Sequence, residues 1–265
     1  MTTENTSRIS RRSMLRTSGA LVAGTAVLAA CAGSVDTGIA RIGETPELQP
    51  LDEASVSDAV LLRTAMSVEK MVANILSDER VAGIADAKAK PIVTAYVAAH
   101  TARLGALSSL VTANGGQPDN EPNKKLMAAY GDNVLELMGA GKKASDVLPL
   151  THALESLVAA TYQYFVALTN NAPLRSEMMR LGAQASRRAA VAAQLISSGI
   201  KSFDMQYEED GTTQLAGSVP TFTGAFGALN AVQVQLGPDV KDAPRANVLM
   251  DTPSLNSMSY PLPQP

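Results

Sequence analysis

The chain has 265 residues, of which 22 are basic and 25 are acidic. Without the four arginines and one glutamate of residues 1–30, the net charge of the remaining chain is about −6, which argues against a nucleic-acid-binding protein. Cys31 is the only cysteine, so an intrachain disulfide and a thiolate metal cluster are excluded.

The first 31 residues carry two export motifs. Arg11 and Arg12 precede a short apolar run, residues 20–30, as in twin-arginine export signals. The run ends in Leu-Ala-Ala before Cys31, which looks like the lipobox of bacterial lipoproteins. It is too short to span a membrane, which takes about 20 apolar residues. We therefore expect residues 1–30 to be a signal peptide and Cys31 to be lipidated. The alternative is a chance arginine pair and a stray cysteine.

The next part of the chain predicts a tether and then a helical domain. Residues 31–54 contain Cys31 and a stretch punctuated by Gly and Pro, without periodicity. Residues 55–199 show four long helical patterns and a shorter one. Lys90-Pro91 marks either a kink in the second long helix or its true start. The helical patterns cover about residues 57–77, 85–112, 123–138, 145–170 and 173–198.

The loop lengths predict how these helices are connected. The first two long helices are joined by a few residues, as are the last two, whereas the middle link is long. Two antiparallel hairpins joined by one long crossover predict an all-α fold, the ferritin-like four-helix bundle. Residues 200–265 spread their apolar residues among Gly, Thr and Pro. We expect them to pack on the bundle as a partly extended C-terminal segment, with one short helix at about 223–235.

Ionisable residues lie within the apolar seams of the first three long helices. The first seam contains Glu69, and the third contains His152 and Glu155. Buried carboxylates are costly unless they are paired, protonated or bound to metal, so these residues are the candidate site. The seam assigned to the second helix contains Val93, Val97, His100, Leu104, Leu107 and Val111.

The chain resembles bacterial ferritin-like proteins that carry a twin-arginine signal. The resemblance covers about residues 56–198, and more weakly the chain to residue 260. It implies a ferritin-like fold and, in a complete family member, a di-iron centre built from two glutamates and two Glu-x-x-His motifs. The matching segments are Val68-Glu69, Val97-Ala98-Ala99-His100, Gly115-Gly116-Gln117-Pro118, Ala153-Leu154-Glu155 and Asn256-Ser257.

The chain also departs from the di-iron pattern. Val97 stands where the second helix should carry its glutamate, and Gln184 and Arg187 replace the Glu-x-x-His pair of the fourth helix. We therefore expect no symmetric di-iron centre.

Two hypotheses account for the remaining polar residues. In the first, Arg187 or Arg188 points inward and bridges Glu69 and Glu155, because a guanidinium can bind two carboxylates. The alternative is that both arginines lie on a solvated face.

In the second hypothesis, His152 and Glu155 project from one helical face and join His100 and Glu69 in a site for a single iron, manganese or zinc ion. The alternatives are a hydrogen-bonded core histidine at either position and solvent exposure of His152.

The functional expectation follows from the absence of recognisable catalytic motifs in the sequence. The chain has no Gly-x-Ser-x-Gly motif, no phosphate-binding loop and no nucleophilic cysteine, so no catalytic residue is assigned. We expect a cofactor-free, non-catalytic scaffold or accessory subunit, held by the lipid on Cys31 at the outer face of the bacterial cytoplasmic membrane or in the periplasm and cell envelope. Its partner would be an integral-membrane or envelope protein complex. The alternative is a metal-binding oxidoreductase or metal-storage protein with an altered site.

Overall fold

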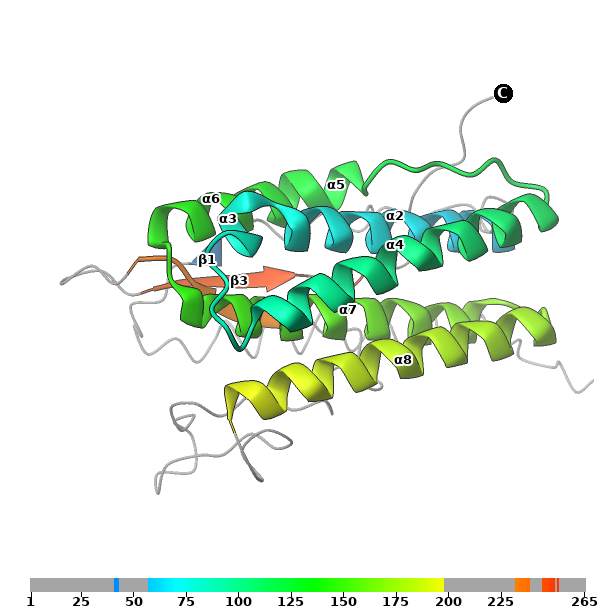
Figure 1. Cartoon of the computed structure of the whole chain (residues 1–265). Coiled ribbons are helices and arrows are strands. Elements are labelled where there is room, and N and C mark those ends of the chain that lie inside the picture. The colour runs from blue at the N-terminus through cyan, green and yellow to red at the C-terminus, as the bar shows by residue number, and fades with distance from the viewer. Residues whose placement is uncertain (1–40, 43–56, 198–231, 239–244, 251, 253–265) are drawn as a thin grey trace, which may run out of the picture. The chain divides into compact units, whose positions relative to one another are not determined.

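The computed structural model describes residues 41–42, 57–197, 232–238, 245–250 and 252, and these residues are mostly helical. Four long helices dominate them (Figure 1). Helix α2 packs along α4, α7 packs along α8, and α2 and α7 join the two pairs. The long helices are α2 (Asp58–Ser77), α4 (Lys90–Ala113), α7 (Val147–Leu168) and α8 (Ala172–Ile196).

The helix ends follow from local sequence. The side chain of Ser57 accepts a hydrogen bond from the backbone N–H of Val60 at the start of α2, and Asn171 does the same for Leu174 at the start of α8. Pro91 lies in the first turn of α4, where a missing N–H costs nothing. Lys90-Pro91 is therefore the true start of this helix, which settles the alternative left open by the sequence.

The middle link runs from the end of α4 to the start of α7 through short helical pieces. The pieces are α5 (Lys124–Leu126), the π-helix η2 (Met127–Gly131), α6 (Asp132–Gly141) and the 3-10 helix η3 (Ala144–Asp146). Helix α6 packs against the short helix α3 (Glu79–Ala82), which connects α2 and α4.

A small sheet of short strands accompanies the helices, and the described residues remain mostly helical, in agreement with the all-α prediction. Its strands are β1 (Arg41–Ile42), β2 (Val232–Leu236) and β3 (Ala246–Met250), in the order β1-β3-β2. Strand β3 pairs parallel with β1 and antiparallel with β2, and β2 packs against α7.

Two predictions are corrected by this sheet. Residues 232–235, expected to be helical, belong to β2, because Val232, Val234 and Leu236 alternate with glutamines at the period of a strand. Residues 41–42, expected to be tether, form β1. The remaining tether and residues 198–231 and 253–265 lie outside the described residues.

The two helices within each pair differ in how deeply they are buried. Helices α2 and α7 are covered on nearly all sides, whereas α4 buries a single stripe. None of the helices in the described ranges combines the length and the apolar character that crossing a membrane requires. The buried residues of α4 are Val93, Tyr96, His100, Arg103, Leu107 and Val111.

Candidate functional site

Three helices each place one ionisable side chain at the centre of the helical assembly. Glu69 comes from α2, His100 from α4 and Glu155 from α7, and each residue is 0% exposed. All three were singled out in the sequence, and the structure brings them into direct contact. The chemistry of the site therefore depends on which groups neutralise these buried charges.

His100 lies between the two carboxylates. Its Nδ1 contacts Glu69 Oε2, and its Nε2 lies 2.9 Å from Glu155 Oε1. A neutral imidazole has one N–H, whereas the doubly protonated imidazolium can donate to both carboxylates at once. Burial lowers the pKa of His100, but the charge of Glu69 and the hydrogen bonds to both glutamates outweigh burial and raise the pKa to about 9.

Glu69 is the most heavily hydrogen-bonded carboxylate of the site. Its Oε1 accepts hydrogen bonds from Arg103 Nη1 at 2.5 Å and from the hydroxyl of Tyr162 at 2.7 Å. Burial raises the pKa of Glu69, but the charges and hydrogen bonds of His100 and Arg103 lower it to about 2. The pKa of Tyr162 rises well above 10, through burial first and the negative charge of Glu69 second.

The fourth helix reaches the site through Arg188. Its Nε donates to Glu155 Oε1 at 2.8 Å, and its guanidinium lies 5.7 Å from the centre of the Tyr96 ring. The hydroxyl of Tyr96 donates to the backbone oxygen of Arg188 at 2.8 Å. Arg187 is exposed, as the alternative of a solvated face expects for it.

The arrangement differs from the arginine bridge expected from the sequence. Glu69 and Glu155 are paired with two different arginines, Arg103 and Arg188, and His100 joins them. We call the five residues Glu69, His100, Arg103, Glu155 and Arg188 the ion network. With both carboxylates ionised, its three cations and two anions leave one net positive charge.

Arg103 was missed by the sequence reasoning. It follows His100 by three residues on the buried stripe of α4, and its Nη2 donates to Gln184 Oε1 of α8 at 3.1 Å. The assigned seam used Leu104 and Val97, which are only partly buried, instead of Arg103 and Tyr96. The spacing of three from His100 was the available signal.

The donor set does not fit a di-iron centre. Gln184, at a position where the ferritin-like pattern has a ligand, accepts from Arg103, and Arg188 approaches Glu155. The two guanidiniums beside the carboxylates would repel the positive charges of two metal ions. Among the described residues, no group of three or more His, Cys, Asp or Glu side chains is arranged to hold a metal ion.

His152, the fourth candidate ligand, is buried on α7 one turn before Glu155. It is 6% exposed, so the solvent-exposed alternative for this residue is wrong. Burial lowers the pKa of His152 to about 4, which makes it a neutral imidazole near pH 7.

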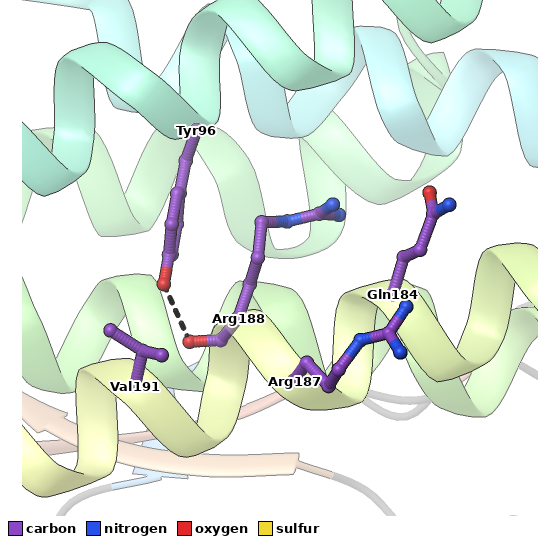
Figure 2. A pocket seen from close by; sticks show the side chains of 5 residues that line it. All are labelled: Tyr96, Gln184, Arg187, Arg188 and Val191. Atoms are coloured by element: carbon purple, nitrogen blue, oxygen red, sulfur yellow. Dashed lines mark hydrogen bonds between the residues drawn. The ribbon is translucent and has the colours of Figure 1, made fainter.

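A pocket of about 340 Å³ lies beside the ion network, between α4 and α8. Figure 2 shows Tyr96 reaching down from α4 and Arg188 rising from α8 toward it. The pocket thus connects the buried charges with the surface. Its lining residues are Tyr96, Gln184, Arg187, Arg188 and Val191.

The two histidines predict a maximum of stability near pH 6.5. The pKa of His100 rises from 6.5 to about 9 on folding, so its stabilising effect is complete below pH 6.5 and is lost as the pH rises through 9. The pKa of His152 falls from 6.5 to about 4, so the unfolded chain binds its proton more tightly and stability is lost as the pH falls from 6.5 to 4. Glu69 adds a further loss only below pH 4.5.

Thermal unfolding measured between pH 4 and pH 9 tests this expectation. The matched variant His152→Gln should flatten the acid side between pH 6.5 and 4 and leave the alkaline side unchanged. A melting temperature that rises steadily from pH 6.5 to 9 would contradict the protonated state of His100.

Arg11, Arg12 and Cys31, the residues of the expected signal and lipid site, lie outside the described residues. Comparison of the chain with protein-family models, with curated proteins and with solved structures finds no significant match.

Proposed function

We propose that this protein is a lipid-anchored, non-catalytic scaffold or accessory subunit of the bacterial cell envelope. The proposal combines the export motifs of residues 1–31 with a ferritin-like helical bundle that uses an ion network where a complete ferritin-like site would use metal. The paired long helices and the long link between them support the ferritin-like arrangement.

The observation that carries the proposal is the position of the His100 ring between two carboxylates. Both ring nitrogens are directed at Glu69 and Glu155, and each carboxylate also accepts from an arginine. Protein groups thus supply the positive charge that a metal would supply. The network draws its residues from α2, α4, α7 and α8, so it ties all four long helices together.

A second candidate function is favoured by the same meeting of side chains at the centre of the helices. Glu69, His100 and Glu155 offer nitrogen and oxygen donors that suit a single iron, manganese or zinc ion, and Glu155 Oε2 has no hydrogen-bond partner within the described part of the chain. A metal would have to displace the protons of His100 and move Arg103 and Arg188. This candidate corresponds to a metal-storage protein or an oxidoreductase with an altered site.

Metal analysis separates the two candidates. The full chain would be expressed in a bacterial host supplied with iron, manganese and zinc, purified from detergent-solubilised membranes and measured by elemental analysis. We expect far less than one metal ion per chain, in the wild type and in Glu155→Ala alike. Near-stoichiometric metal that is lost in Glu155→Ala, with the helical circular dichroism retained, would establish the metal-binding candidate instead.

Fractionation of the same cells tests the anchor. We expect the wild-type chain in the membrane fraction and Cys31→Ser outside it, because the lipid on Cys31 is the proposed membrane anchor. Thr37→Ala, from the same region, serves as the matched control and should stay with the membrane.

A further inference from the structure

We propose that the pocket between α4 and α8 binds a small organic carboxylate. This inference rests on the proposed function, because it needs the ion network rather than a metal ion at the centre of the helices. It adds a ligand to a protein otherwise proposed to act as a scaffold.

The wall of the pocket is positively charged. The ion network has one cation more than it has anions, and Arg188 belongs both to this network and to the pocket wall. Arg187 adds a further positive charge at the same wall and is exposed. A net positive charge next to a low-dielectric interior favours a bound anion.

Arg188 also has an unused hydrogen-bond donor. Arg188 Nε is taken by Glu155, but the buried Nη2 of Arg188 has no hydrogen-bond partner among the described residues. A buried donor without a partner is costly, and a ligand oxygen would remove this cost. Glu155 Oε2 is also without a partner there, but Glu155 does not line the pocket, so a ligand meets the arginines first.

The apolar part of the pocket lining favours an organic anion over an inorganic one. The ring of Tyr96 and the side chain of Val191, which is 46% exposed, form the apolar part of the lining. These groups contact an apolar body well and a bare phosphate poorly. The arginine side of the pocket would hold the carboxylate, with the apolar body toward Val191 (Figure 2).

The pocket volume limits the length of the ligand. About 340 Å³ lies near the lower end of ligand pockets, which measure roughly 300–1,000 Å³. A short-chain carboxylate from solution fits this range, whereas the long acyl chain of a membrane fatty acid would extend out of the pocket. Binding of hexanoate and of palmitate therefore distinguishes a short-chain carboxylate taken from solution from a fatty acid taken from the membrane.

Isothermal titration calorimetry of the full, detergent-purified chain tests the proposal. Hexanoate, acetate, palmitate and inorganic phosphate would be titrated at constant ionic strength, with the heats of detergent alone subtracted. Elemental analysis of the same sample shows separately whether metal is present. We expect hexanoate to bind at least about tenfold more tightly than acetate, because additional methylene groups are buried. Phosphate and palmitate should bind more weakly than hexanoate.

Two matched variants locate the site. Arg187→Gln removes an exposed cation of the pocket and should weaken hexanoate binding about tenfold. Arg180→Gln makes the same substitution on α8 at a residue paired with Glu177, outside the pocket lining, and should leave binding unchanged. No binding by a metal-free wild type, equal binding of acetate and hexanoate, or an equal effect of both substitutions would overturn the inference. Stoichiometric metal would instead overturn the proposed function on which the inference rests.

Discussion

Replacing Glu69 by glutamine is expected to lower the free energy of unfolding by about 3–5 kcal/mol. Glutamine keeps the shape of the side chain but removes the negative charge that faces His100 and Arg103. Both cations are buried, so neither can recover its hydration. Urea denaturation followed by circular dichroism measures the loss.

Two comparisons isolate the charge effect. Glu177→Gln breaks a surface ion pair with Arg180 and should cost about 1 kcal/mol or less. Combining Glu69→Gln with Arg103→Met removes the uncompensated cation as well, so the double variant should be more stable than Glu69→Gln alone. If the two substitutions simply add, the ion network is not the source of the loss.

Replacing Asp146 by alanine is expected to lower the free energy of unfolding by about 2–3 kcal/mol. Asp146 is buried just before α7, and its Oδ2 accepts a hydrogen bond from the backbone N–H of Gly237 at 3.1 Å. Its Oδ1 pairs with Arg245, which precedes β3. Alanine therefore leaves a buried donor unpaired and removes a link between the sheet and the helices.

Asparagine at the same position provides the matched control. Asp146→Asn keeps an acceptor for Gly237 and loses only the ion pair with the partly exposed Arg245, so it should cost about 1 kcal/mol. Hydrogen exchange should show the difference locally, with the amides of β2 and β3 exchanging faster in Asp146→Ala than in Asp146→Asn. Equal exchange in the two variants would argue against a role for the Gly237 hydrogen bond.

Part of the helical structure could be predicted because its signals are local. The caps at Ser57 and Asn171 each act within one turn of the chain, and α2 and α8 begin close to where these residues predict. Helix α4 begins at Lys90, which was one of two alternatives, and not at about residue 85, where the helical pattern starts. Strand β2 was misassigned as helix because its alternating pattern covers only a few residues and gains meaning from pairing with β3.

Only those site residues could be predicted that are ionisable and lie in an apolar helical seam. Glu69, His100 and Glu155 stood out because charged residues are rare in apolar seams. Arg103 did not, since an arginine on a helix is ordinarily a surface residue, and only the packing of α4 against α2 turns it inward. The choice between Arg187 and Arg188 depends on helix rotation, which the sequence of α8 does not define closely enough.

The pairing of β1 with β3 has a consequence for the order of folding. Arg41 pairs with Asn247, so this contact joins the first and the last regular elements of the described chain. The helical hairpins need only local contacts, and we expect them to form before the sheet, whose closure has to wait for distant residues. Because β3 lies between β1 and β2, a chain shortened before residue 246 loses the partner of both strands at once.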